Sequence, residues 1–268
     1  MKFVPPSAAD WQLFLDWARA ENWRVPEQEQ RLFLGRWRPY FFALKIGGAA
    51  QGFVSARPYH ESGWIGNLLV DPERRGQGFG AALFDFALGF LRQLQLPRIW
   101  LTASPSGLPL YQRRGFVGVD RIERWQGSGL GRAELQKIPL LSELIRLDQE
   151  CWGEFRGALL IPLAEAGEIC RAGNSLAVLQ PGTAAWQLGP WLAAKQCPRK
   201  NHLLLNEALA RTPAGRTLLM DVPVSAELGQ LLRSAGFARI ANNELMCLSR
   251  QPVRLDGVLA LASLGSIG

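Results

Sequence analysis

Cysteine and histidine are scarce in this 268-residue chain, which has only four cysteines and two histidines. The cysteines, Cys151, Cys170, Cys197 and Cys247, lie far apart, and none belongs to a Cys-x-x-Cys pair. Cysteine and histidine are the usual zinc ligands, and disulfide frameworks are typical of much smaller secreted domains. The sequence therefore predicts neither a metal site nor a disulfide scaffold.

Long apolar runs are also missing, since none reaches the roughly 20 residues that cross a bilayer as a helix. The opening residues, MKFVPPS, lack the apolar core of a signal peptide. Together with the scarcity of cysteine, these absences predict a cytoplasmic protein with no membrane partner.

The chain is basic but has no dense run of lysine or arginine: its formal net charge is +7 and its pI is near 9.7. A surface that binds nucleic acid usually shows as a basic stripe or cluster. The scattered charges indicate a solvated surface and a site for an anionic cofactor. They argue against nucleic acid as a partner.

A P-loop is absent as well, because no Gly-x-x-x-x-Gly-Lys-Ser/Thr run occurs. A Rossmann loop is nearer, since Gly76, Gly78 and Ala81 fit its glycine pattern. That motif requires an acidic residue at the end of the next strand, and the strand expected at residues 98–102 is followed by Ala-Ser-Pro. Residues 71–74 also separate the glycines from the preceding strand, where a Rossmann turn is tight. Both departures disfavour a dinucleotide fold.

What the chain does have is a glycine-rich loop within residues 70–83, VDPERRGQGFGAAL. The apolar run at 64–70 predicts a buried strand before it, and apolar residues at helical spacing follow it. Glycines let a ligand approach the main chain, and N–H groups at a helix start bind phosphate oxygens. Arg74 and Arg75 add charged donors. The sequence therefore predicts an anion-binding loop suited to a diphosphate.

This loop resembles the Q/R-x-x-G-x-G/A motif of the GNAT acyltransferases, which holds the pyrophosphate of acetyl-CoA. The matching residues are Arg75, Gly76, Gln77, Gly78, Phe79 and Gly80. The preceding Val-Asp-Pro is similar to the end of the family's fourth strand. The resemblance implies that main-chain groups of Leu69 and Val70 bind the pantetheine arm and polarise the thioester carbonyl.

A second family signature, L-Y-x-x-x-G-F, is matched at residues 110–116, LYQRRGF. Tyr111 corresponds to the tyrosine that gives a proton to the departing thiolate, so the resemblance implies that it is the general acid. The alternative is a packing aromatic on a short helix. Ser106 stands where many relatives have an asparagine that contacts the cofactor, and it is expected to bind acetyl-CoA.

The resemblance does not identify a general base on the fourth strand. Relatives often carry a glutamate on the fourth strand, whereas residues 64–70 contain no carboxylate. Glu61, just before that strand, is the nearest candidate, with His60 beside it. Deprotonation of the acceptor through ordered water is the alternative.

The order of expected elements matches one GNAT domain over residues 1–127. Helical patterns precede a hairpin around Gly47-Gly48, and a β-α-β unit and a further strand follow. The chain is therefore expected to be of the α/β class. Its sheet should be mixed and mostly antiparallel, flanked by helices, with a V-shaped splay at the fourth strand.

The second half repeats the first at a constant shift of 121 positions (236 − 115 = 121). Residues 231–237, LLRSAGF, repeat the pattern of residues 110–116. The shift also sets residues 189–191 beside 68–70. A constant shift indicates a second GNAT-like domain, and the chain resembles tandem GNAT proteins of bacteria. The second domain is expected at 140–268, after a linker at 128–139.

The second copy departs from the family where the chemistry requires a match. Under the shift, the glycine loop becomes residues 196–201, which contain no glycine and include Pro198, and Tyr111 becomes Leu232. Proline removes an N–H donor. The second domain is therefore expected to bind no acetyl-CoA.

Together these matches imply an N-acetyltransferase that moves an acetyl group from acetyl-CoA to a primary amine in a ternary complex. The acceptor, a small molecule or a peptide, stays open. One alternative is a non-catalytic acyl-CoA sensor, and another is a nucleic-acid-associated acetyltransferase or nucleic-acid binder. The chain is expected to be a monomer with paired domains, and a dimer stays open.

Overall fold

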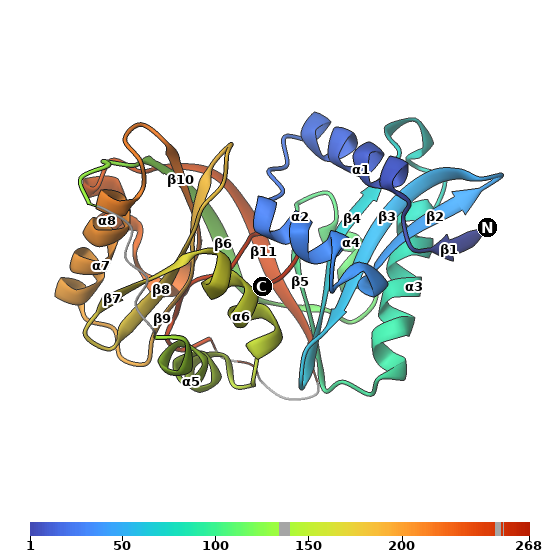
Figure 1. The fold of residues 1–268 in the computed structure, drawn as a ribbon. Helices are drawn as coiled ribbons and strands as arrows, with labels where there is room; N and C mark the ends of the chain where they lie inside the picture. The colour runs from blue at the N-terminus through green and yellow to red at the C-terminus, as the bar shows by residue number, and fades with distance from the viewer. Residues whose placement is uncertain (134–139, 250–252, 254) are drawn as a thin grey trace. The chain divides into compact units, whose positions relative to one another are not determined.

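The computed structural model describes residues 1–133, 140–249, 253 and 255–268 (Figure 1). These residues form two compact units, Met1–Leu101 with Gly265–Ile267, and Thr102–Leu264 with Gly268. Within the described ranges, no helix combines the length and the apolarity that crossing a membrane requires.

The N-terminal unit is a mixed sheet with helices on both faces. In chain order it contains β1 (Lys2–Val4), α1 (Ala8–Ala20), α2 (Glu27–Leu34), η1 (Arg38–Tyr40), β2 (Phe41–Ile46), β3 (Ala49–Pro58), β4 (Ser62–Val70), η2 (Pro72–Arg74), α3 (Phe79–Gln93) and the start of β5 (Arg98–Ala103). Strands β1 to β4 pair antiparallel in sequence order, and β5 joins β4 in parallel. The predicted hairpin is β2–β3, where Gly47 and Gly48 have φ values of 58° and 87°.

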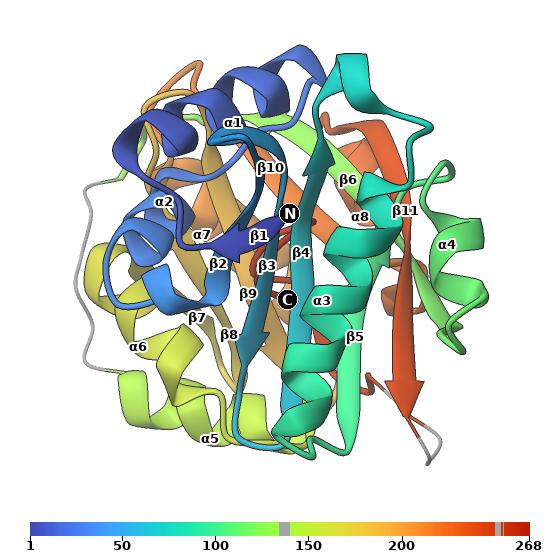
Figure 2. The same cartoon turned by 90° about the vertical axis from the view of Figure 1, so that its right-hand side faces the viewer.

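Helix α3 covers one face of this sheet, and α1 covers the other. The apolar stripe predicted after the glycine loop is buried along α3, which lies against β3 and β4 (Figure 2). On the opposite face, the Phe14 ring of α1 lies 5.7 Å from the Phe53 ring of β3, and Trp17 lies 5.5 Å from it. Alternate side chains of β3 therefore point towards α1 on one face of the sheet and towards α3 on the other.

Strands β4 and β5 begin as neighbours and then part. Their parallel ladder covers Ser62, Gly63 and Trp64, although β4 continues to Val70. Asn67 adopts a φ of 52°, and the register between β3 and β4 shifts at this point. A bulge of this kind bends the strand and increases its twist. The predicted V-shaped splay at the fourth strand is therefore present.

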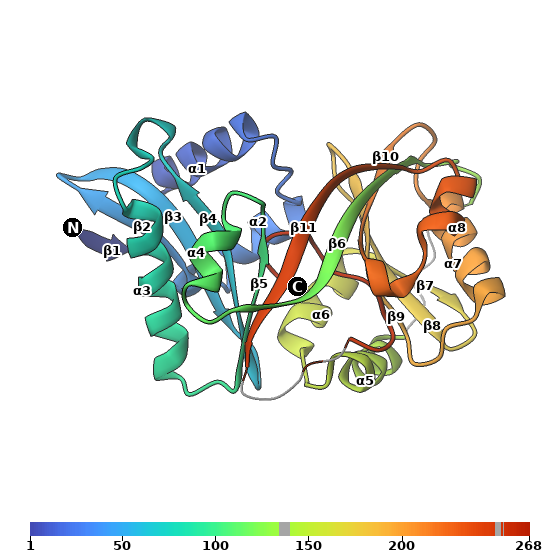
Figure 3. The same ribbon diagram turned by 180° about the vertical axis from the view of Figure 1, so that it is seen from behind.

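The C-terminal unit is a second mixed sheet. In chain order it contains the end of β5, α4 (Leu108–Gln112), β6 (Val117–Ser128), α5 (Leu141–Trp152), α6 (Gly157–Ala166), β7 (Glu168–Ala172), β8 (Ser175–Gln180), β9 (Trp186–Ala193), α7 (Pro198–Arg211), β10 (Thr217–Pro223), η3 (Val224–Ala226), α8 (Gly229–Ser234), β11 (Ala238–Ser249) and β12 (Val258–Ala260). Its strand order is β11-β6-β10-β9-β8-β7, with β12 against β9. Figure 3 shows β6 and β11 side by side over much of their length.

The sequence repeat corresponds to repeated structure. Residues 68–70 lie on β4 and residues 189–191 on β9, while the two LxxxxGF signatures begin on α4 and α8. Like β4 and β5, strands β9 and β10 are parallel and pair only briefly, through Leu218 with Trp186 and Leu219 with Gln187. Two GNAT-like copies were predicted, and both are present.

The splay in the second copy is filled by the chain itself. Strand β12 pairs with β9 through Val258 with Leu192 and Ala260 with Trp191. The N–H group of Leu261 donates to the carbonyl of Asp221 on β10 at 2.8 Å. This segment therefore bonds to both strands of the wedge that β9 and β10 form.

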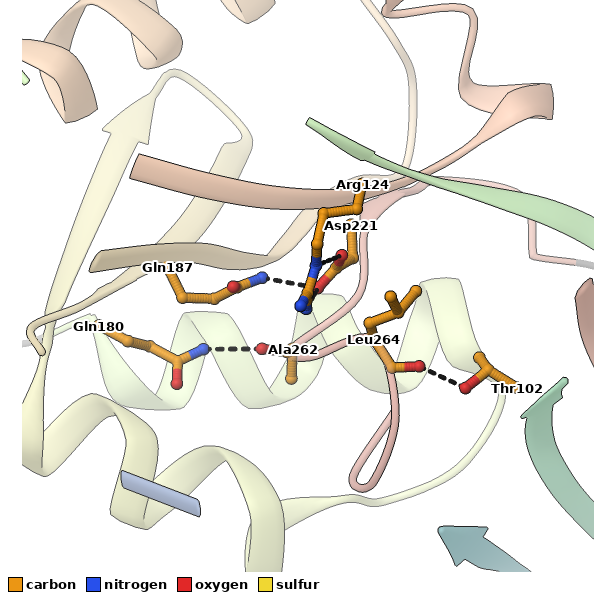
Figure 4. Close-up of polar contacts among 7 residues, drawn as sticks. All are labelled: Thr102, Arg124, Gln180, Gln187, Asp221, Ala262 and Leu264. Carbon is orange, nitrogen blue, oxygen red and sulfur yellow. Dashed lines mark hydrogen bonds and ion pairs between the residues drawn. The ribbon is translucent and has the colours of Figure 1, made fainter. Parts of the chain in front are cut away.

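A buried polar network fixes this arrangement (Figure 4). The guanidinium of Arg124 on β6 donates two hydrogen bonds to the Asp221 carboxylate, at 2.7 and 2.8 Å, and Gln187 donates a third at 2.9 Å. Gln180 donates to the Ala262 carbonyl at 3.0 Å, and the Thr102 hydroxyl donates to the Leu264 carbonyl. Asp221 therefore joins three strands, and residues 262–264 are held beside them.

The two compact units divide at Leu101/Thr102 because β6 forms its ladders with β10 and β11. The domain limits at residues 127 and 140 stay predictions. Of the expected linker, residues 134–139 lie outside the described part of the chain. Leu130 and Arg132, just before them, donate main-chain hydrogen bonds of 2.8 Å to the carbonyls of Leu209 and Ala210 at the end of α7.

Candidate active site

The glycine loop leaves β4 through a short turn and enters α3 with its backbone exposed. The Asp71 carboxylate accepts a hydrogen bond from the Glu73 N–H group at 3.0 Å, which orders the turn. Gly76 and Gly78 have φ values of 76° and 84°, in the left-handed region that favours glycine. A Cβ atom added to either would meet nothing within 4 Å. Their open surroundings leave room for a ligand against the main chain.

The start of α3 offers main-chain donors to an anion. Gly78 is its N-cap residue and has no side chain that could accept hydrogen bonds from the first turn. That turn contains no acidic residue, and the helix is 15 residues long. Phe79 and Gly80 open the helix, and the Val70 side chain lies 3.6 Å from where a Cβ of Gly80 would stand. Such a helix terminus has the polarity that binds phosphate groups.

Three of the predicted cofactor residues flank these glycines. Gln77 lies exposed between Gly76 and Gly78. Leu69 and Val70, at the end of β4, lie beyond the last residue that pairs with β5. The structure therefore brings the strand end, the loop and the helix start together within the N-terminal unit.

Arg75 is held by an acidic neighbour. Its Nη2 atom lies 2.5 Å from Oε1 of Glu21, the C-cap residue of α1. Both side chains are partly exposed, at 47% and 36%. The guanidinium therefore stays near the loop, with a carboxylate as its partner.

Glu61 lies at the other end of β4, just before its first residue. Its carboxylate pairs with Arg98 at 3.1 Å and lies 3.9 Å from Nδ1 of His60, and the side chain is half exposed. The nine-residue strand separates it from the loop by about 30 Å at a rise of roughly 3.3 Å per residue. The structure does not bring Glu61 and the glycine loop together.

A carboxylate that sequence reasoning missed lies nearer the bulge of β4. Glu29 on α2 is 1% exposed and accepts a hydrogen bond from the hydroxyl of Ser266. The Cα atom of Ser266 lies 2.6 Å from where a Cβ of Gly66 would stand, one residue before Asn67. The sequence carried no signal for this arrangement, because the hydrogen-bonded residues are 237 positions apart.

Tyr111 and Ser106 belong to the C-terminal unit. Tyr111 lies on α4, is 8% exposed, and packs its ring against Gly107, where a Cβ would stand 3.0 Å from the ring. Burial raises the pKa of Tyr111 to about 12. The phenol therefore keeps its proton near neutral pH and can act as a donor. Ser106 is exposed in the turn before α4, with its hydroxyl 3.1 Å from that of Ser104.

The second copy has a proline-containing helix start in place of the glycine loop. Helix α7 begins at Pro198, which offers no N–H group, and Cys197 is its N-cap residue. Hydrogen bonds from the backbone N–H groups of Lys200 and Arg199 lower the pKa of the Cys197 thiol. This helix start therefore contains no glycine and has one N–H donor fewer than the start of α3. That the second copy binds no acyl-CoA stays a prediction.

Comparison with known proteins gives the same assignment for both halves. The model of the acetyltransferase (GNAT) family matches residues 10–116, and that of an acetyltransferase (GNAT) domain matches residues 144–257. The chain is 26% identical to holothin acyltransferase of Pseudoalteromonas sp. (strain SANK 73390), over 92% of this chain and 88% of the relative.

Solved structures share the fold at low identity. A putative acetyltransferase from Pyrococcus horikoshii superposes with a TM-score of 0.81 and 17% identity, over 99% of this chain and 95% of that one. A GCN5-related N-acetyltransferase from Sphaerobacter thermophilus gives a TM-score of 0.62 and 16% identity, over 94% and 97%. Because the two family models together match most of the chain, it belongs to the acetyltransferase (GNAT) family and carries two GNAT domains in tandem.

Proposed function

We propose that this GNAT acyltransferase uses acetyl-CoA and transfers the acetyl group to a primary amine. The observation that carries the proposal is the helix start at Gly78, where open main-chain donors follow a strand end that has left its parallel neighbour. Membership of the family and the similarity to a holothin acyltransferase support acyl transfer. The residues proposed to bind acetyl-CoA are Leu69, Val70, Arg75, Gly76, Gln77, Gly78, Phe79, Gly80 and Ser106.

The proposed reaction requires the protein to polarise the thioester carbonyl, to give a proton to the departing thiolate and to take a proton from the amine. Acetyl-CoA supplies the thioester, and the amine nitrogen forms the new C–N bond as the C–S bond breaks. A main-chain N–H group at the Leu69–Val70 strand end would polarise the carbonyl. Tyr111 would give its proton to the departing thiolate, for which its raised pKa keeps it protonated. The proton that the amine loses needs a base.

We propose Glu29 as that base. The carboxylate is buried, and Ser266 connects it with β4 at the bulge. Glu61, the candidate closest in sequence to the strand, instead pairs with Arg98 at the far strand end.

Calorimetric titration of acetyl-CoA into the wild type and a Gly78→Asp variant tests the donor site. The substitution adds a side chain and a negative charge where the diphosphate is proposed to bind. Gly48→Asp is the matched control, because Gly48 has a φ of 87° and equally open surroundings in the β2–β3 turn. One site per chain, lost only in Gly78→Asp, is the expected result. Two sites, or equal binding by both variants, would contradict it.

A non-catalytic acyl-CoA sensor is the second candidate, and the lack of a carboxylate on β4 favours it. A sensor would bind acetyl-CoA but release no CoA in the presence of any amine, and Tyr111→Phe would change nothing. If the wild type releases CoA with any amine and Tyr111→Phe does not, the result supports an enzyme over a sensor. The cytoplasmic location and the monomeric state remain predictions.

A further inference from the structure

Arg57 on β3 is enclosed by aromatic rings. Its Cζ atom lies 4.7 Å from the ring centroids of Trp37 and Tyr40 and 5.5 Å from that of Tyr59. The residue is only 8% exposed, and its Nε–H group has no hydrogen-bond partner among the described residues. Burial lowers the pKa of Arg57, and the neighbouring Tyr59 and Tyr40 oppose that shift.

The other buried arginines of the described chain have carboxylate partners. Arg124 pairs with Asp221 at 2.7 Å, Arg156 with Asp148 at 2.5 Å, and Arg211 with Glu168 at 3.3 Å. Arg57 forms no ion pair within the part of the chain that the structure describes. A buried charge without a counterion is costly, and aromatic faces compensate for only part of that cost. The arrangement favours an anion supplied from outside the chain.

The guanidinium lies on the α1 face of the sheet, near the bulge of β4. Side chains two residues apart on a strand share a face, so Arg57 and Ser55 lie on the face of Phe53, which contacts α1. Ser55 accepts a hydrogen bond from Asn67 at 3.3 Å. Two residues along a strand span about 7 Å, which is comparable to a small amino acid. Tyr59, at the end of this row, donates to the Ile267 carbonyl at 2.7 Å, which fixes one wall of the aromatic enclosure.

We propose that Arg57 binds a carboxylate of the acceptor, so that the acceptor is an amine that also carries a carboxyl group, such as an amino acid or a short peptide. This rests on the proposed function, since it names the acceptor class of the same reaction. A guanidinium edge binds the two oxygens of a carboxylate in parallel, and the unpartnered Nε–H belongs to such an edge. The groups named around Arg57 are phenols and an indole, so its single charge matches a monoanion better than a phosphate dianion.

Binding is tested first without acetyl-CoA. Thermal unfolding is followed with a panel of N-acetyl amino acids, which are the expected products, and with their uncharged amides. The variants are Arg57→Met, Arg57→Lys, which keeps the charge but loses the planar edge, and the exposed control Arg19→Met. We expect some of the acids, but not their amides, to raise the melting temperature of the wild type and of Arg19→Met. Arg57→Met should lose this shift, and Arg57→Lys should lose most of it.

Several outcomes would overturn the proposal. These are equal shifts by acids and amides, equal shifts in Arg57→Met, or a shift by inorganic phosphate and by none of the acids. If Arg57→Met does not fold, the comparison of acids with amides in the wild type and in Arg57→Lys still tests whether Arg57 binds a carboxylate.

Transfer assays then separate this proposal from the proposed function. Amino acids are compared with their decarboxylated amines, for example phenylalanine with 2-phenylethylamine, and CoA release is measured. We expect at least a tenfold higher kcat/KM for the carboxylated member, which Arg57→Met abolishes by raising KM. Acetylation of the neutral amines alone would overturn the carboxylate site but keep the acetyltransferase. Carboxylate binding that depends on Arg57, in a chain that binds no acetyl-CoA, would instead overturn the proposed function.

Discussion

Arg75 and Glu21 form an ion pair of 2.5 Å at the edge of the glycine loop. A diphosphate bound to this loop would compete with the Glu21 carboxylate for the same guanidinium. Glu21→Gln is therefore expected to tighten acetyl-CoA binding. An exposed pair contributes about 0.2–1 kcal/mol, which corresponds to a dissociation constant lower by up to about fivefold. Calorimetric titration measures it.

Asp16→Asn is the control for that variant. Asp16 pairs with Arg19 at 3.0 Å on the same helix, with both side chains exposed, and neither belongs to the loop. Its removal should leave the acetyl-CoA affinity unchanged. Weaker binding in Glu21→Gln would mean that Glu21 positions Arg75 for the ligand instead of competing with it.

Tyr111→Phe should lower kcat by about 100-fold or more while leaving acetyl-CoA affinity unchanged, because it removes a proton donor and keeps the ring. Burial raises the pKa of this phenol to about 12. The phenol therefore stays protonated from about pH 6 to 9 and loses its proton only as the pH approaches 12. Rates measured across this range should show no alkaline fall from Tyr111. An unchanged kcat in the variant would leave Tyr111 as a packing residue.

Glu29→Gln should lower kcat by about 100-fold or more if Glu29 takes the proton of the amine. Its acetyl-CoA affinity and melting temperature should stay unchanged, which separates the loss of a base from a structural defect. Glu61→Gln is the matched comparison and should change kcat less than about twofold, since it breaks only an exposed pair with Arg98. A larger loss in Glu61→Gln than in Glu29→Gln would reverse the assignment.

Leu259→Ala should destabilise the protein by about 2–5 kcal/mol, because Leu259 of β12 is fully buried in the core of the C-terminal unit. Denaturant unfolding measures the change. Leu203→Ala on α7 is the control, since that side chain is 53% exposed and should contribute little. A loss below about 0.5 kcal/mol in Leu259→Ala would mean that β12 is only loosely held in the wedge.

The sequence was sufficient for features that depend on neighbouring residues. The glycine spacing at residues 76–80 indicated a loop that enters a helix, and Gly47-Gly48 indicated the hairpin, because both depend on local backbone conformation. The splay at β4 followed from the resemblance. The shift of 121 positions located the second copy without any tertiary information.

Features that depend on contacts between distant residues could not be predicted from the local sequence. Glu61 is close to β4 in sequence, but the strand runs away from it towards the loop. Glu29 and Ser266 are 237 positions apart in the sequence and meet only in the folded chain. Arg57 had a partial signal, because Phe53, Ser55 and Arg57 alternate with small apolar residues, but its aromatic enclosure draws on a separate segment around Trp37 and Tyr40. Strand β12 has only three residues, too few for a periodic pattern.

Strand β12 makes the two copies unequal in a way that no mutation of the loop alone would. As part of the same chain, it reaches the wedge between β9 and β10 at an effective concentration that a dissociating cofactor cannot match. Its binding energy belongs to folding, so the second copy needs no ligand to complete its sheet. This agrees with the prediction that the helix start at Cys197 and Pro198 holds no diphosphate. The second domain can therefore act as a scaffold whose sheet is always complete. The corresponding wedge in the first domain is the one proposed to take a cofactor that binds and dissociates.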